Sequence, residues 1–168
     1  MKYENWENYD MTIEIQTSLA IATQILRHRS FTYQQFSQRY AEKNLINESI
    51  DLPELRRQDI KNRQNSIDDI SEDIKNRFHK KIKKHFDEAT ELYNDMLNAG
   101  IAKESARFVL PQATTTRMYM TGTIRSWMHY IELRSSHGTQ KEHMDIANQI
   151  KLIFNQNCPT IKSAMNWE

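Results

Sequence analysis

The stretch from Arg27 to Tyr40 carries the residues of this sequence that are best suited to chemistry on an anion. It holds three arginines and one histidine, with serine and threonine hydroxyls among them. Arginine presents a planar fork of donors that matches phosphate oxygens two at a time, and serine adds a short, directional hydroxyl. The stretch therefore predicts a site for a phosphomonoester or a pyrophosphate.

A plainer interpretation exists for Arg27-His28-Arg29 alone, because cations near the C-terminus of a helix are favoured by the helix dipole. The pattern is longer, however, since Ser37 follows after seven residues, and Arg39 and Tyr40 after one more. At average residue frequencies, Arg-His-Arg with this spaced serine is expected by chance in only about one such chain in a few thousand. We therefore favour the anion site.

Length and composition limit the class of protein. The length of 168 residues is typical of a single domain. A formal net charge of +1 argues against binding of nucleic acid or of an anionic membrane by the field of the whole protein. A single cysteine, Cys158, excludes an internal disulfide and a cysteine-rich metal site. With no membrane-spanning apolar run and no signal peptide, we expect a cytoplasmic protein without a metal.

Several elements must position the cationic cluster. The alternating run from Met11 to Gln16 predicts a strand. Thr17 or Ser18 would cap a helix that carries Gln24 near its end. The apolar face of this helix would consist of Leu19, Ala22, Ile25 and Leu26. Residues 30–36 lack a helical pattern and predict a loop, and residues 37–40 are expected to be extended.

A polar segment from Asn44 to Asn65 contains the basic pair Arg56-Arg57. Acidic residues interleave with these arginines and no aromatic platform accompanies them, so we favour a solvated helix or lid over a nucleic-acid surface. Ser66 and Asp69 have the spacing of a capping box, which predicts that a long helix begins there. Its apolar stripe, a core or partner-helix contact, is Ile70, Ile74, Phe78, Ile82, Phe86, Ala89, Tyr93 and Met96. The histidines expected in solvent are His79 and His85.

The long helix is expected to stop at Gly100. The rest of the chain predicts further helices around a second strand. Residues 103–110 favour a short helix, which Pro111 ends, and residues 114–121 favour a strand, which Gly122 breaks. Apolar periodicity predicts two more helices, over residues 123–133 and 140–154. The whole pattern indicates an α+β fold, in which a helix-rich single domain contains a small, mainly antiparallel sheet.

Four motifs in order resemble those of the flavin-dependent thymidylate synthases, the ThyX family. The first is the Arg27-His28-Arg29 pattern, with Gln24 three residues before it. The stretch from Ala106 to Pro111 is similar to the family's Ala-Arg-x-x-Leu-Pro. The stretch from Arg125 to Arg134 is similar to its Arg-Ser-Leu-x-His/Asn-Phe-x-x-Leu-Arg, and the stretch from His137 to Glu142 matches His-x-x-Gln-x-Glu. The agreement covers most of the chain.

The resemblance implies reductive methylation of dUMP to dTMP, with carbon from methylenetetrahydrofolate and reducing equivalents from NADPH through FAD. The implied FAD-binding residues are Arg27, His28, Arg29, Gln35, Thr123, Ile124, Arg125 and His129. The implied dUMP-binding residues are Gln24, Arg27, Gln35, Ser37, Gln38, Arg39, Arg107 and Arg134. Arg134 would be catalytic, because its fixed charge can stabilise negative charge that develops across N3 and the adjacent carbonyl. Cys158 need not take part, since the family uses no cysteine nucleophile on the pyrimidine.

The resemblance also implies a homotetramer with shared active sites. Three departures accompany it. The chain begins just before the first strand, so an N-terminally shortened domain is expected, and Lys2 and Glu4 replace the His and Ser of a family segment. Gln35 stands where the family usually has Glu. Two alternatives therefore stay open: a non-catalytic homologue that binds nucleotide or a partner, and an enzyme that modifies C5 of a related pyrimidine nucleotide such as dCMP.

Overall fold

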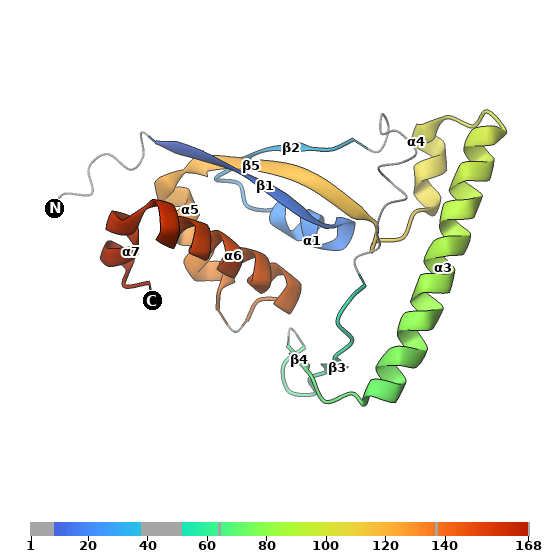
Figure 1. Ribbon diagram of the computed structural model, residues 1–168, viewed down its shortest axis with the longest axis horizontal. Helices are drawn as coiled ribbons and strands as arrows, with labels where there is room; N and C mark the ends of the chain where they lie inside the picture. The colour runs from blue at the N-terminus through green and yellow to red at the C-terminus, as the bar shows by residue number, and fades with distance from the viewer. Residues whose placement is uncertain (1–8, 38–51, 64, 137, 168) are drawn as a thin grey trace.

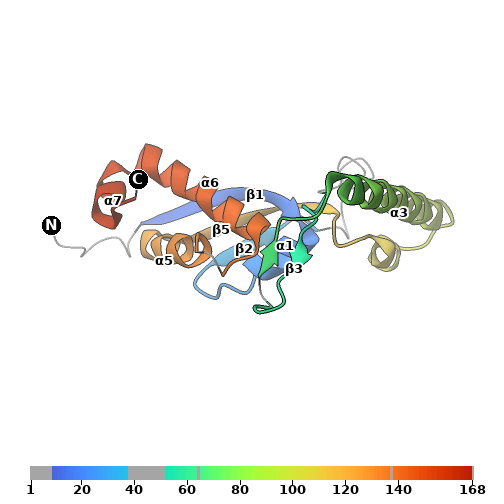
Figure 2. The ribbon, with the colours of Figure 1, turned by 90° about the horizontal axis from the view of Figure 1, so that it is seen from below.

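The computed structural model describes residues 9–37, 52–63, 65–136 and 138–167. A three-stranded antiparallel sheet in the order β1-β5-β2 has one face covered by helices (Figures 1 and 2). The strands are β1 (Asp10–Ser18), β2 (Thr32–Gln35) and β5 (Thr115–Thr123). The helices are α1 (Leu19–Ile25), α5 (Ile124–Arg134), α6 (Lys141–Asn157) and α7 (Pro159–Met165). We call this part of the molecule the body.

The core of the body follows from the alternation of the two long strands. Ile13 and Ile15 of β1 are buried and lie opposite Met120 and Met118 of β5, while the residues between them face outward. The predicted strand at residues 11–16 and the mainly antiparallel sheet are therefore confirmed. Ser18 caps α1 as predicted, because its side chain accepts a hydrogen bond from the backbone of Ile21.

Two expectations near the sheet were wrong. Residues 30–36 are not a loop throughout, because Thr32–Gln35 pairs with the free edge of β5 as strand β2. Gly122 does not break β5, which continues to Thr123. The ring of Phe31 lies over this glycine, and a Cβ there would come within 2.4 Å of Phe31 Cδ1. Gly122 is thus a position of close approach within a strand.

The first helix also differs from its predicted face. Ile21, Ala22 and Ile25 are buried, whereas Leu26 is 38% exposed. The reason is that α1 ends at Ile25, so Leu26 is its C-cap and turns away from the core. Beyond α6, whose predicted range of residues 140–154 is close to the observed one, the chain forms α7, which the sequence analysis did not predict.

The described part of the polar segment is extended, so the expected helix is wrong there. Residues 52–58 lead into a short hairpin of β3 (Arg57–Gln58) and β4 (Ser66–Ile67). Because Ser66 belongs to β4, the long helix does not begin at it. Helix α3 (Glu72–Asn98) begins after Ser71 instead. Gly100 follows its end with a φ of 82°, as the predicted stop requires.

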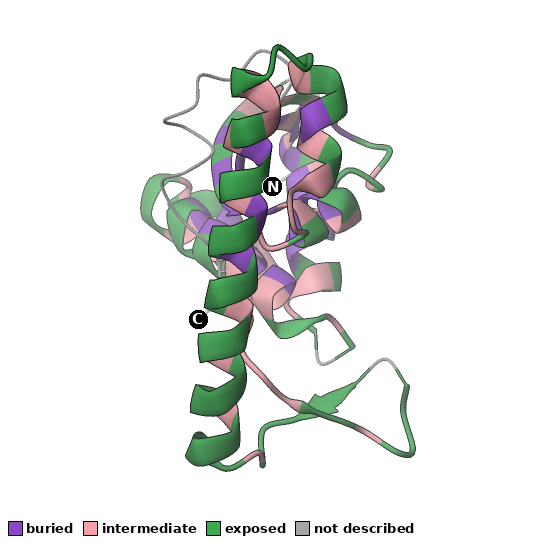
Figure 3. Cartoon of the chain, turned by 90° about the vertical axis from the view of Figure 1, so that its right-hand side faces the viewer, coloured by how far each residue is buried: buried purple, intermediate pink, exposed green. Residues whose placement is uncertain are grey.

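Helix α3 stands at one side of the molecule (Figures 1 and 2). It packs on α4 (Lys103–Ala106) and on the 3₁₀ turn η2 (Arg107–Val109), and we call these three elements the arm. Of its predicted stripe, Phe86, Ala89 and Tyr93 are buried. Ile74 and Phe78, by contrast, are each 42% exposed. Figure 3 shows that most residues in the first half of α3 are exposed, with the hairpin beside this half.

The two histidines of α3 have different surroundings. His85 is exposed, as expected. His79 is half-buried and its Nε2 lies 3.0 Å from the carbonyl oxygen of Pro53, so its expected solvation was wrong. Within the described ranges, no helix is long and apolar enough to cross a membrane.

Candidate active site

Two segments that are more than a hundred residues apart in the sequence meet at the ends of α1 and α5. Arg134, the last residue of α5, donates from Nε to Nε2 of His28 at 2.9 Å. Tyr33 of β2 supports the turn that carries His28, because its hydroxyl lies 2.9 Å from the carbonyl oxygens of both Ile25 and His28. The sheet and both helices thus fix one guanidinium against one imidazole.

An aromatic wall surrounds this pair. The ring of His28 makes an edge contact with Tyr130, with centroids 4.9 Å apart, and Phe31 packs edge-on against Trp127 at 4.8 Å. The hydroxyl of Tyr130 lies 2.9 Å from Nε2 of His143, which is fully buried. The other ring nitrogen of His143 has no partner among the described residues. The wall keeps water from the inner side of the site.

The protonation state of His28 follows from its position. Burial, with the charge of Arg134 and a smaller effect of His129, lowers the pKa of His28 to about 4. At neutral pH the ring is therefore uncharged, and Nε2, which accepts from Arg134, carries no proton. The proton resides on Nδ1. Burial and the same arginine also lower the pKa of His143 to about 4.

This geometry leaves the two terminal amino groups of the Arg134 guanidinium available to a ligand. Only Nε is used by His28, and among the described residues none accepts from the two terminal amino groups. Arg134 as a whole is half-buried. A planar pair of donors with a fixed charge is suited to a planar group with adjacent acceptors.

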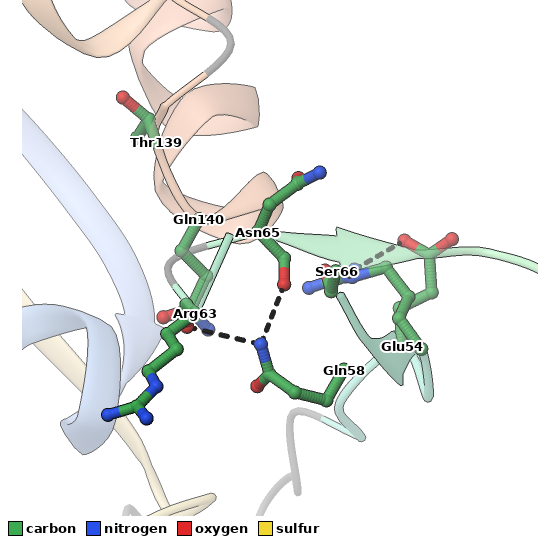
Figure 4. Close-up of a pocket in the computed structure, with 8 residues that line it drawn as sticks. Glu54, Gln58, Arg63, Asn65, Ser66, Thr139 and Gln140 are labelled. Carbon is green, nitrogen blue, oxygen red and sulfur yellow. Dashed lines mark hydrogen bonds and ion pairs between the residues drawn. The ribbon is translucent and has the colours of Figure 1, made fainter. Parts of the chain in front are cut away.

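A polar group adjoins this site. Gln24 of α1 donates from Nε2 to Oε1 of Gln140, and Gln140 donates to Glu142 of α6. Beyond Gln140 lies an open pocket of about 250 Å³. Residues of the hairpin line its other side. Figure 4 shows Gln58 of the hairpin bonded to the carbonyl oxygens of Arg63 and Asn65, while Thr139 and Gln140 also line the pocket.

The outer side of the site is cationic. Arg27 and Arg29 flank His28 and are exposed, and neither pairs with a carboxylate within the described part of the chain. Arg125 and His129 lie one turn apart on the exposed side of α5. His129 is near enough to influence the pKa of His28. This donor set fits an elongated anion with a diphosphate, so the residues present fit a flavin dinucleotide.

Comparison with known proteins gives the family. The family model described as "Thymidylate synthase complementing protein" (Thy1) matches residues 3–160. The chain belongs to this family.

Individual Thy1-family relatives and neighbours agree. A probable flavin-dependent thymidylate synthase of Paramecium bursaria Chlorella virus 1 is 48% identical, over 99% of this chain and 77% of that protein. The flavin-dependent thymidylate synthase of Synechocystis is 47% identical, over 96% of this chain and 74% of that protein. A Streptomyces cacaoi UMP/dUMP methylase, crystallised with 5-Br dUMP, superposes with a TM-score of 0.84 at 25% identity. That match covers 97% of this chain and 73% of the methylase.

The structure brings together six of the residues that the Thy1-family resemblance implied, and it places Thr123, Ile124 and Arg125 at the opposite end of α5 from Arg134. Gln24, Arg27, His28, Arg29, His129 and Arg134 lie around the ends of α1 and α5. Gln35, in β2, donates to Thr116 at 3.3 Å, and Ser37 follows two residues later. Thr123 caps α5. Ile124 is buried, so only its backbone can face a ligand.

One implied residue lies away from this site, and two lie outside the described residues. Arg107 lies on the 3₁₀ turn beside α3 and α4, away from α5 (Figure 1). Gln38 and Arg39 lie outside the described residues, so their implied phosphate contacts stay predictions.

Sequence reasoning did not assign several residues that now surround the site. Tyr33 and Tyr130 lie inside segments that the sequence analysis singled out but received no role, and His143 was not assigned. Glu142 and Gln140 were recognised as part of a motif but received no role. Arg56 was assigned to a solvated segment. The signal for Gln140 and Glu142 was the spacing His-x-x-Gln-x-Glu, which does not show which partners they contact, and Arg56 carried no such signal.

Proposed function

We propose that this Thy1-family chain is a flavin-dependent thymidylate synthase that methylates dUMP to dTMP. The observation that carries the proposal is the hydrogen bond between Arg134 and His28. It joins the arginine that the resemblance directs to the pyrimidine with the histidine that the resemblance directs to the flavin. The high identity to proteins named for this activity supports the same conclusion.

Arg134 performs the electrostatic step. Its terminal amino groups face the pyrimidine ring, where they stabilise the negative charge that develops across N3 and the adjacent carbonyl. Neutral His28 holds the guanidinium through Nε without adding a second positive charge. Arg27 and Arg29 bind anionic groups of the ligands at the mouth of the site.

The cofactor is FAD, and NADPH and methylenetetrahydrofolate are the co-substrates. When bound, FAD supplies the reducing equivalents that complete the methyl group. Arg29, Arg125 and His129 are exposed and would hold it through charge-assisted hydrogen bonds, while Phe31 and Trp127 pack in the core behind them.

The active enzyme is a homotetramer whose sites draw on more than one copy. Arg107 belongs to the arm, so the site of another copy is where it can contact nucleotide. The exposed apolar residues Ile74 and Phe78 of α3 support this assembly, because another copy can cover them.

The test is an assay of dTMP formation from dUMP with methylenetetrahydrofolate, NADPH and FAD, run beside a flavin absorbance spectrum. The proposal expects stoichiometric flavin and turnover that depends on all four components. Protein that binds dUMP and flavin without making dTMP would favour the non-catalytic homologue instead.

A second substrate class has one observation in its favour. The Streptomyces cacaoi neighbour is a UMP/dUMP methylase that was also crystallised with 5-Br UMP. The assay should therefore be repeated with UMP and with dCMP. Methylation of either at a rate equal to that of dUMP would shift the assignment to a broader pyrimidine-nucleotide methylase.

A further inference from the structure

The segment before the hairpin is joined to the start of α6 by two ion pairs, Lys141 with Glu54 and Arg56 with Glu142, and Arg56 is the more buried of the two cations. The side chain of Arg56 is only 9% exposed. Its Nη2 donates to both carboxylate oxygens of Glu142, at 2.8 and 2.9 Å, and its Nη1 donates to Glu54 at 3.1 Å. Its Nε donates to Ser66 Oγ at 2.9 Å. All three nitrogens of the guanidinium are therefore used inside the protein.

The carboxylate of Glu142, which accepts both hydrogen bonds from Arg56 Nη2, stays ionised. Burial alone would raise the pKa of Glu142, but its own backbone N–H, Gln140 and Arg56 together hold that pKa below its usual value. An ionised carboxylate can only accept hydrogen bonds. Gln140 must therefore turn its Nε2 toward Glu142, at 2.9 Å. The orientation of the Gln140 amide is thus set by charge.

The same reasoning extends one residue further, to α1. With its nitrogen on Glu142, Gln140 presents Oε1 to Gln24, whose Nε2 donates to it at 2.6 Å. Gln24 thereby commits its Nε2 end to Gln140, and its own Oε1 has no donor among the described residues. The chain of contacts from Arg56 to Gln24 leaves the carbonyl oxygen of Gln24 available, and Gln24 lies four residues before His28, the partner of Arg134.

We propose that Arg56 is a positioning residue for nucleotide binding. Through Glu142 and Gln140 it orients Gln24 so that the Gln24 carbonyl oxygen accepts a hydrogen bond from an N–H or hydroxyl of the substrate. This inference rests on the proposed function, because it takes the substrate to be a pyrimidine nucleotide. If Glu142 were absent or uncharged, both glutamine amides could rotate, and half of the orientations would present an N–H donor to a substrate donor.

The test compares Glu142→Gln and Arg56→Met with the wild type. Both variants should raise the KM for dUMP, and its Kd measured by titration calorimetry, by about tenfold, the cost of roughly one hydrogen bond. The kcat at saturating dUMP and the flavin content should remain within about twofold. A merely structural role would instead lower kcat, flavin content and Tm together, and that result would overturn the inference.

The neighbouring residue provides a matched control. Arg57 lies in the same basic pair and also grips a carboxylate, Asp69, at 2.6 Å, but both side chains are exposed and the pair does not contact α6. Arg57→Met should leave the KM for dUMP unchanged. A rise equal to that of Arg56→Met would overturn the inference. Glu142→Gln keeps the size and shape of the side chain, so it decides the question even if Arg56→Met does not fold.

A double-mutant comparison tests whether Arg56 and Glu142 act on nucleotide binding through Gln24. If Arg56 acts through Gln24, adding Glu142→Gln to Gln24→Ala should raise the KM no further than Gln24→Ala alone. Additive rises would show that Glu142 acts elsewhere. Failure of the proposed function is distinguishable, because it would appear as wild-type protein that binds dUMP but forms no dTMP. In that case the Kd measurements would still decide the role of Arg56.

Discussion

The body and the arm differ in how far they bury their apolar residues. In the body, the buried faces of the sheet, α1, α5, α6 and α7 meet in one core, and the aromatic rings of Trp127 and Tyr130 are fully buried in it. In the arm, the core reduces to Tyr93 and Ala106 with a few partly buried neighbours, and Phe78 remains 42% exposed. The body has a large core of its own, although Leu133 and Leu152 stay exposed, whereas the arm buries few apolar residues within one chain. The site residues that the structure places lie in the body, except for Arg107, which lies in the arm.

The largest effect is expected inside the body. Arg134→Ala should lower kcat for dTMP formation by at least about a hundredfold, because it removes the charge that stabilises the activated pyrimidine. Flavin should remain bound, since Arg27, Arg29 and Arg125 are intact. Turnover measured against FAD concentration checks this. Recovery of activity with excess FAD would contradict the role, whereas such recovery is expected for Arg29→Ala.

The next largest effect tests whether the arm serves another copy. Arg107→Ala should lower dTMP formation by roughly ten- to a hundredfold through loss of a charged contact to the nucleotide. Mixing it with Arg134→Ala and allowing subunits to exchange should restore part of the activity, because some sites then receive both arginines from intact copies. If the mixture is no more active than its separate components, Arg107 does not act between copies.

The body was easier to predict from the sequence than the arm and its hairpin. Alternation at residues 11–16 required a strand, since only that pattern places Ile13 and Ile15 on one face. The start of α3 was misplaced because Ser66 fits a capping box locally, but its hydroxyl bonds to Arg56, ten residues away. Likewise β2 exists because β5 has a free edge.

The site shows the same limit of sequence reasoning. Its motif residues could be named from spacing and resemblance, but the pairing of His28 with Arg134 requires the fold, because their separation in the sequence is 106 residues. Arg56 is the clearest case. Nothing local distinguishes it from Arg57, and only tertiary structure buries one on Glu142 and leaves the other exposed on Asp69.

A third prediction addresses the exposed face of the arm directly. Phe78→Glu should weaken self-association by at least about tenfold, since a carboxylate would have to be buried against the second copy. The variant should stay folded, because Phe78 is 42% exposed within one chain. Light scattering at micromolar concentration measures the mass. Lys80→Glu, on the exposed side of the same helix, is the control and should leave the mass unchanged. An unaltered mass for Phe78→Glu would assign the assembly to another surface.

The smallest effect concerns stability and pH, and it again separates the body from the arm. His143 is buried in the body with its pKa lowered from 6.5 to about 4, mainly by burial. Between these values the unfolded chain binds a proton that the folded chain does not, so stability is complete above about pH 6.5 and falls as the pH approaches 4. The shift corresponds to a loss of roughly 1–3 kcal/mol, and His28 adds a similar dependence.

Replacing His143 by glutamine should therefore remove about half of this pH dependence, while an amide still reaches the hydroxyl of Tyr130. Urea unfolding at a series of pH values between 4 and 7 measures the slope. His85→Gln is the matched control, because His85 is exposed on α3 and its loss should leave the slope unchanged. An identical slope in His143→Gln and the wild type would mean that His143 gains its proton without unfolding, and that burial in the body does not keep this ring neutral.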